Sequence, residues 1–113
     1  MANEKMIWKG GSGKPYEFTI ITIDKTFQPK YCGNYIFAKI VGNAWHAVYM
    51  GEGDLKDRTE THKTDGCVIK KGATHIHYRL NSDSKSSFAD ETDLLAGNQE
   101  AYEPNGCNVK KGG

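Results

Sequence analysis

The sequence contains few cysteines and no long apolar run. Its three cysteines, Cys32, Cys67 and Cys107, are an odd number and form no CxxC pair, so they predict neither a disulfide framework nor a zinc knuckle. Reduced thiols are typical of a cytoplasmic protein. No apolar stretch approaches the roughly 20 residues that a bilayer-spanning helix needs, and the N-terminus lacks the charged and apolar segments of a signal peptide. We therefore expect a cytoplasmic protein that does not insert into a membrane.

The sequence also lacks a strong net charge. It has 15 basic and 14 acidic side chains and a formal net charge of +1. Such a balanced chain has no overall field to attract nucleic acid or an acidic membrane, so any phosphate site must be built from a local cluster. At 113 residues the chain is long enough for one core and too short for two, and we expect one domain.

Periodicity and turn residues predict four strands and two helices. Residues 1–14 are interpreted as an irregular lead-in because they end in a glycine-rich turn. Gly42 and Asn43 tolerate positive φ, which predicts a hairpin between the strands that flank them. The strands are expected at 16–23, 33–41, 44–51 and 73–80, the helices at 54–63 and 87–96, and a short extended piece at 67–72.

Alternation assigns the hairpin residues to faces of the sheet. It places Tyr35 and Phe37 on one face of the first hairpin strand. In the second strand it places Trp45, Ala47 and Tyr49 together on one face. Both hairpin strands therefore contribute a tyrosine.

The helix expected at 54–63 carries Arg58 and His62 four residues apart, so both side chains project from one face. Asp54 is its expected N-cap. A guanidinium and an imidazole beside two phenols suit a phosphate, because arginine gives a planar fork to phosphate oxygens and histidine relays protons near neutral pH. The alternative is an exposed charged helix in which Arg58 pairs with Asp54 or Asp57.

The helix expected at 87–96 carries Glu91 between apolar residues on the flank that should be buried. A charged residue is unusual in such a place. Ser87 and Asp90 resemble a capping box at the start of this helix. Glu91 is therefore a candidate functional residue.

Taken in chain order, these features resemble the GIY-YIG nuclease family. The matching positions are Gly33-x-Tyr35, Tyr49-x-Gly51, Arg58, His62, the helical Glu91, and Pro104-x-x-x-Asn108. The tripeptides read Gly-Asn-Tyr and Tyr-Met-Gly here, and their middle position is variable in the family. The resemblance covers residues 33–108. Residues 1–32 are then an N-terminal extension with one strand and 109–113 a tail, all within one domain.

The resemblance implies an α+β fold with a small antiparallel three-stranded sheet flanked by helices, to which the strand at 16–23 is an addition. It also implies a metal-dependent endonuclease that hydrolyses phosphodiester bonds in DNA with Mg²⁺ or Mn²⁺. Glu91 is the implied metal ligand, and one carboxylate with several waters is a normal Mg²⁺ shell.

The resemblance further implies a role for each site residue. Tyr35 is the implied general base or water orienter, and Tyr49 positions water or phosphate. Arg58 stabilises the charge of the phosphate, and His62 relays a proton or contacts the phosphate. Asn108 braces the site. Asn105 is a rival for the last role because it follows Pro104 directly. A free tyrosine has a pKa of about 10, so Tyr35 acts as a base only if nearby cations lower that pKa.

Lysines outside the site are candidate contacts to a DNA backbone. They are Lys39, Lys63, Lys70 and Lys71, with Lys110 and Lys111 in the tail. The alternative is that they are solvated loop lysines.

Two other hypotheses stay open beside the endonuclease. One is a domain of the same fold that binds nucleic acid without cutting it, which fits the balanced charge. The other is a small α+β protein-interaction domain whose tyrosines only pack. If Tyr35, Tyr49, Arg58 and Glu91 do not converge within a single cleft, the nuclease hypothesis is wrong. The oligomeric state is open, and a domain of this size needs two copies, such as a homodimer on DNA, or two encounters to break both strands.

Overall fold

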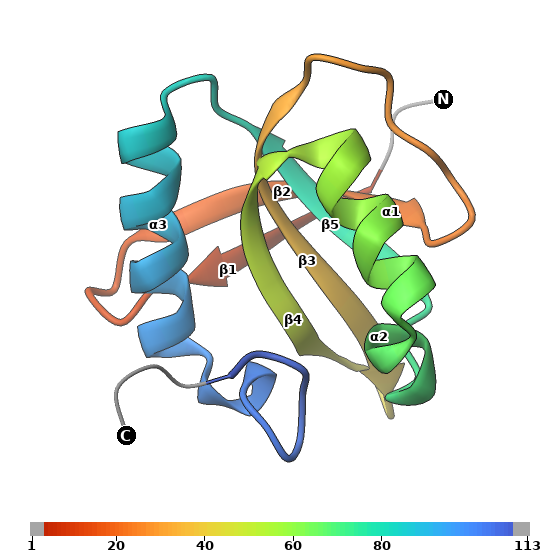
Figure 1. Cartoon of the computed structure of the whole chain (residues 1–113). Coiled ribbons are helices and arrows are strands. Elements are labelled where there is room, and N and C mark those ends of the chain that lie inside the picture. The colour runs from red at the N-terminus through yellow and green to blue at the C-terminus, as the bar shows by residue number, and fades with distance from the viewer. Residues whose placement is uncertain (1–3, 110–113) are drawn as a thin grey trace.

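The computed structural model describes residues 4–109 and shows one curled antiparallel sheet with helices on both faces (Figure 1). Its strands are β1 (Lys5–Lys9), β2 (Pro15–Thr22), β3 (Cys32–Val41), β4 (Ala44–Asp54) and β5 (His75–Leu80). Its helices are α1 (Leu55–Asp65), α2 (Cys67–Lys70), α3 (Ser84–Gly97) and the short 3-10 helix η1 (Gln99–Ala101). The sheet order is β1-β2-β5-β3-β4, and all neighbouring strands are antiparallel.

The expected three-stranded sheet with one added strand is wrong, because five strands form a single sheet. The strand expected at 16–23 is β2, which pairs directly with β5 and lies inside the sheet. β1 lies in the segment expected to be an irregular lead-in. Of its residues only Trp8 is buried, so the sequence has no alternating apolar pattern that would identify a strand. The strand is recognised in the fold from its pairing with β2. In the same way, α2 replaces the extended piece expected at 67–72.

β3 and β4 form the expected hairpin, with Gly42 at the turn in a left-handed conformation, φ 64°. A β-bulge interrupts their register. Phe37 lies opposite Tyr49, whereas the next residue of β3 lies opposite Ala47, so Val48 is the extra residue. The bulge reverses the alternation, and Tyr49 shares a face with Phe37. The expectation that Tyr49 shares a face with Ala47 is therefore wrong.

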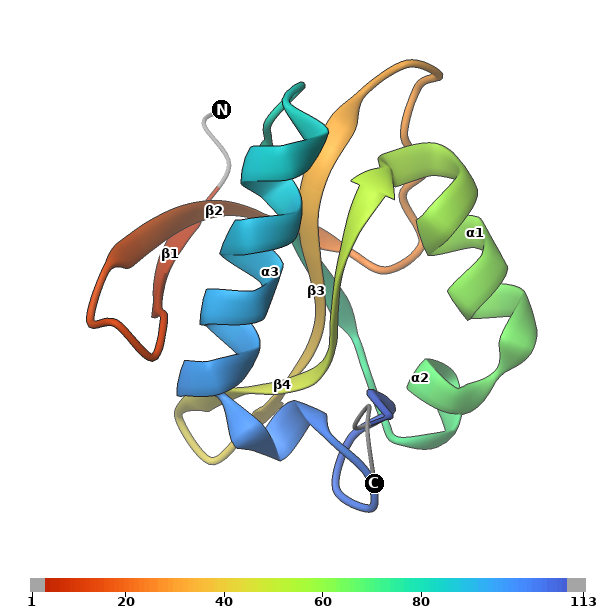
Figure 2. The same ribbon diagram turned by 60° about the vertical axis from the view of Figure 1, so that its left-hand side comes forward.

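Each face of the sheet has its own apolar core. Figure 2 shows α3 on one side of β3 and β4, and α1 with α2 on the other. The core under α3 consists of Trp8, Tyr16, Phe18, Ile36, Ala38, Ala47, Met50, Leu94, Leu95 and Ala101. The core under α1 and α2 consists of Tyr35, Phe37, Val48, Leu55, Val68, Ala73 and Ile76. Successive residues of β3 enter opposite cores, and this fixes the register of the strand, because a slip of one residue would exchange the two faces.

The ends of the helices were only partly predictable. Asp54 caps α1 as expected, and its carboxylate accepts a hydrogen bond of 3.0 Å from the Asp57 backbone N–H. α3 begins earlier than expected, because Asp83 is its N-cap. Ser87 and Asp90 lie inside α3, so the expected capping box is wrong. Within residues 4–109, none of the helices is both long and apolar enough to cross a bilayer.

Cys67 and Cys107 form a disulfide between the start of α2 and the C-terminal segment, and Cys32 is free. The expectation of three reduced thiols is therefore wrong. The two bonded cysteines are 40 residues apart in the sequence. Spacing alone does not reveal which cysteines a fold will bring within bonding distance.

Candidate active site

Tyr35 and Tyr49 lie beside each other on the face of the sheet that α1 covers. Their ring centroids are 6.1 Å apart and the rings are tilted by 25°. The bulge in β4 turns Tyr49 to this face. From α1, the His62 ring lies 4.1 Å from the Tyr49 ring and 6.0 Å from the Tyr35 ring. The hairpin and α1 thus bring three of the predicted site residues together.

The two glycines of the tripeptides are required by close contacts. A Cβ on Gly51 would overlap the Tyr35 phenol, whose Cε1 lies only 2.9 Å from that position. A Cβ on Gly33 would overlap the backbone carbonyl of Arg79 in the neighbouring strand β5. Gly51 therefore lets the Tyr35 side chain lie against β4, and Gly33 lets β3 and β5 approach.

The Tyr35 hydroxyl is buried and has no hydrogen-bond partner among the described residues. Burial raises the pKa of Tyr35 well above its usual value, Tyr49 and Glu91 add to the rise, and Arg58 opposes it. Burial and then Glu91 also raise the pKa of Tyr49, with Arg58 again opposing. Arg58 lies near the Tyr35 hydroxyl without meeting hydrogen-bond geometry. Glu91 from α3 and Arg58 from α1 are therefore close enough to act on both phenols.

His62 is mainly neutral at pH 7. Burial lowers its pKa, the charge of Arg58 lowers it further, and Asp65 offsets only part of this. Arg58 itself is exposed. Among the described residues it forms no ion pair with Asp54 or Asp57, so the self-paired charged helix is not the arrangement found. The guanidinium is therefore available to an anionic ligand.

A hydrogen-bond network fixes α3 to the sheet next to Glu91. The Asn34 amide donates to the Ser87 carbonyl at 2.9 Å and accepts from Arg79 at 3.0 Å. The same nitrogen of Arg79 donates to Asp90 at 2.7 Å. Ser87 lies one helical turn before Glu91, and Asp90 directly precedes Glu91. The network therefore fixes the position of Glu91 relative to the sheet. Asn34 occupies the middle position that the resemblance treats as variable, and the only signal of its role is a polar residue in an apolar strand.

The candidate metal ligands at the site are carboxylates. Among residues 4–109, no three histidine, cysteine, aspartate or glutamate side chains form a group that could hold a metal. Glu91 supplies one carboxylate near the phenols. Glu52, which sequence reasoning missed, is held by a 2.7 Å hydrogen bond from the Ser87 hydroxyl, one turn before Glu91. One carboxylate completed by water is a normal shell for Mg²⁺ or Mn²⁺, so metal binding at Glu91 stays a prediction.

Asn108 braces β4 at the residue between Tyr49 and Gly51. Its side chain accepts a hydrogen bond from the Met50 N–H at 2.8 Å and donates one to the Met50 carbonyl at 3.0 Å. Asn108 is 7% exposed, whereas the rival Asn105 is fully on the surface. The contacts of Asn108 therefore match the bracing role, and those of Asn105 do not.

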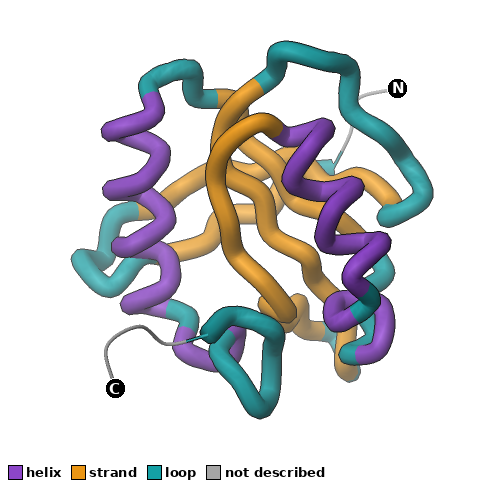
Figure 3. Tube along the Cα trace, viewed as in Figure 1, coloured by secondary structure: helices purple, strands orange, loops and turns teal. Residues whose placement is uncertain are grey.

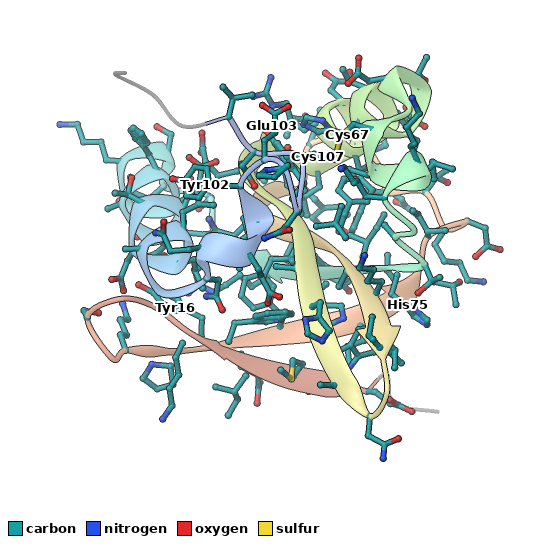
Figure 4. The ribbon with its side chains drawn as sticks, turned by 90° about the horizontal axis from the view of Figure 1, so that it is seen from below. Tyr16, Cys67, His75, Tyr102, Glu103 and Cys107 are labelled. Carbon is teal, nitrogen blue, oxygen red and sulfur yellow. A yellow bond between two sulfur atoms is a disulfide. The ribbon has the colours of Figure 1, made fainter. Side chains whose placement is uncertain are left out.

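The disulfide lies next to this brace. Figure 4 shows Cys67 and Cys107 together where the C-terminal segment meets α2. The Cys107 N–H also donates to the carbonyl of Val48, the bulge residue, at 2.7 Å. The segment that carries Asn108 is thus held covalently by α2 and through hydrogen bonds by β4.

Several of the lysines predicted to contact nucleic acid bind their own chain. The amino groups of three of them donate to backbone carbonyls: Lys39 to Lys71, Lys63 to Lys25, and Lys71 to Pro104. Lys70 is exposed. Lys110 and Lys111 lie outside the described residues. Contact of these lysines with DNA stays a prediction.

Tyr35 of β3 and Tyr49 of β4 lie together, and Arg58 of α1 and Glu91 of α3 are near enough to shift the pKa of both phenols. That the four side chains share a single cleft stays a prediction. Comparison of the chain with protein-family models, with curated proteins and with solved structures gave no match. The resemblance to GIY-YIG nucleases stays a prediction, and the assignment of a function rests on the geometry of this site.

Proposed function

We propose that the protein is a metal-dependent endonuclease that hydrolyses phosphodiester bonds in DNA. The observation that supports this most directly is that Arg58 and Glu91 lie near enough to Tyr35 and Tyr49 to shift the pKa of both phenols. Hydrolysis of a phosphodiester places extra negative charge on the phosphate oxygens. The exposed guanidinium of Arg58 can meet that charge with two parallel hydrogen bonds.

In this proposal, Tyr35 and Tyr49 act as hydrogen-bond donors that position the attacking water or the phosphate. Their pKa values are raised, so both phenols stay protonated near neutral pH and neither is a good base. This replaces the role of base that the resemblance implied for Tyr35. His62 is the better candidate, because a neutral imidazole next to the Tyr49 ring can accept the proton of the attacking water.

Glu91 is proposed to hold Mg²⁺ or Mn²⁺. Such an ion, when bound, supplies Lewis-acid stabilisation of the charge on the phosphate. Arg58 binds and orients the phosphate from the other side of the hairpin. A cytoplasmic location stays a prediction, and the Cys67–Cys107 disulfide removes the cysteine argument for it.

A nicking assay on supercoiled plasmid tests the proposal. The wild type with Mg²⁺ or Mn²⁺ should convert the plasmid to open circles, and a chelator should stop the reaction. Glu91→Gln should lose at least about 100-fold in rate, because it keeps the size of the side chain but removes the carboxylate. Glu17→Gln is a matched control, since Glu17 is an exposed carboxylate on β2.

Thermal unfolding of each variant shows whether the fold is retained. If the wild type does not nick DNA with either ion, the protein is not an endonuclease, and DNA binding without nicking would indicate a binding domain. If Glu91→Gln nicks as fast as Glu17→Gln, the site has been placed wrongly.

A further inference from the structure

A groove lies between the loop that joins β2 to β3 and the strand β5. Its volume is about 510 Å³, within the range of about 300–1,000 Å³ typical of ligand sites. A second recess of about 460 Å³ adjoins it, and both include Tyr31 and Leu80. In Figure 3 this loop runs beside the start of α1. The groove is outside the candidate active site, but its loop is hydrogen-bonded to the first residue of α1.

Three aromatic side chains line the groove. Phe27 and Tyr78 pack edge to face with their centroids 5.1 Å apart. Tyr31 is 48% exposed, and Leu80 beside it is 57% exposed. Exposed aromatic and apolar groups that border a recess offer faces on which a flat, unpaired base can stack.

The charge of the groove suits a phosphate chain. Lys25 lines the groove and Lys30 lines the adjoining recess. No acidic side chain lines either one among the described residues, although the chain as a whole has nearly as many acidic as basic residues. Lys30 also has a φ of 75°, a left-handed conformation that non-glycine residues rarely adopt. Aromatic faces bordered by lysines are the combination found in sites for single-stranded nucleic acid.

The groove is joined to the candidate active site through two elements. Tyr78 of β5 lies directly opposite Tyr35 of β3 in the sheet. The Tyr31 carbonyl accepts a hydrogen bond of 2.9 Å from the N–H of Leu55, the first residue of α1. Arg58 follows three residues later. A strand whose phosphate is bound at Arg58 can therefore continue past the N-terminal end of α1 into the groove.

We propose that the groove binds unpaired nucleotides next to the phosphate that is cut, so that the preferred substrate is DNA with a single-stranded segment beside a duplex. That the bound DNA is a substrate rests on the proposed endonuclease function. The binding of unpaired nucleotides does not depend on it. A duplex does not fit the groove in the same way, because its bases are stacked on each other and present no free face to Tyr31.

Fluorescence anisotropy with a labelled oligothymidylate tests the binding in the presence of a chelator, so that no cleavage is needed. The wild type should bind it more tightly than a blunt duplex of the same length. Tyr31→Ala should weaken binding at least about fivefold, the minimum expected for one stacked base. Phe88→Ala is the matched control, because Phe88 is equally exposed on α3 and lines neither the groove nor the adjoining recess. Lys25→Ala should reduce the dependence of affinity on salt.

The outcomes separate this proposal from the endonuclease function. Equal effects of Tyr31→Ala and Phe88→Ala, or tighter binding of the duplex, overturn the groove proposal even if plasmid is nicked. Oligonucleotide binding that depends on Tyr31 supports it even if no nicking occurs. If the protein instead self-associates and Tyr31→Ala abolishes this in gel filtration, the occupant is a second copy of the chain, and the proposal is wrong.

Discussion

Asn108→Ala should be among the most destabilising single changes at a buried polar residue of this domain. The wild-type side chain makes two hydrogen bonds, at 2.8 and 3.0 Å, to the N–H and carbonyl of Met50. Met50 is 1% exposed, so water cannot replace these partners without opening the structure. Each buried polar group left without a partner costs about 1–3 kcal/mol, which gives about 2–6 kcal/mol for the pair. This is a large part of the about 5–15 kcal/mol that stabilises a typical small domain.

Urea denaturation of purified protein, followed by tryptophan fluorescence, measures this loss. Asn105→Ala is the control, because Asn105 is exposed in the same segment and should change the free energy of unfolding by less than about 0.5 kcal/mol. At low temperature, where enough Asn108→Ala stays folded, plasmid nicking should also fall, since Met50 lies between Tyr49 and Gly51. Equal stability of the two variants would refute the idea that Asn108 braces β4.

Three further predictions concern packing, protonation and the disulfide. Gly51→Ala should destabilise the fold by about 1–3 kcal/mol, because the new methyl group overlaps the Tyr35 phenol; an unchanged urea midpoint would contradict this contact. His77 accepts a hydrogen bond from Trp8, and burial lowers its pKa to about 4. The unfolded chain therefore binds more protons between pH 4 and about 6.5, so stability should fall by about 3 kcal/mol as pH falls across this range; a His77→Asn variant with the same pH slope would contradict this. Cys67→Ser opens a covalent loop of 40 residues and should cost about 4 kcal/mol in non-reducing buffer, with reductant producing a similar loss in the wild type.

Local signals predicted the parts of the fold that depend on neighbouring residues. Gly42 specifies the hairpin turn through its left-handed conformation, and Asp54 specifies the start of α1 through its bond to a backbone N–H. The spacing of Arg58 and His62 places both on one helix, because four residues are about one turn. These features need no knowledge of the rest of the chain.

The remaining features depend on contacts between distant residues. The strand β1 has a single buried residue, and only its partner β2 makes it a strand. The face of Tyr49 depends on a bulge that follows from the way β4 fits β3, so simple alternation fails there. Asn34 is an ordinary polar residue until α3 packs over it. The bond between Cys67 and Cys107 likewise depends on the path of the chain after α2.

The hydrogen bonds of Asn108 also block the open edge of the sheet against pairing with another chain. β4 is an edge strand, and an unpaired edge is a template on which another chain can add a strand and aggregate. The side-chain amide of Asn108 and the N–H of Cys107 occupy hydrogen-bonding groups of Met50 and Val48 that an incoming strand would need. The edge of the sheet is thus closed beside the bulge by side-chain and loop groups in place of a further strand.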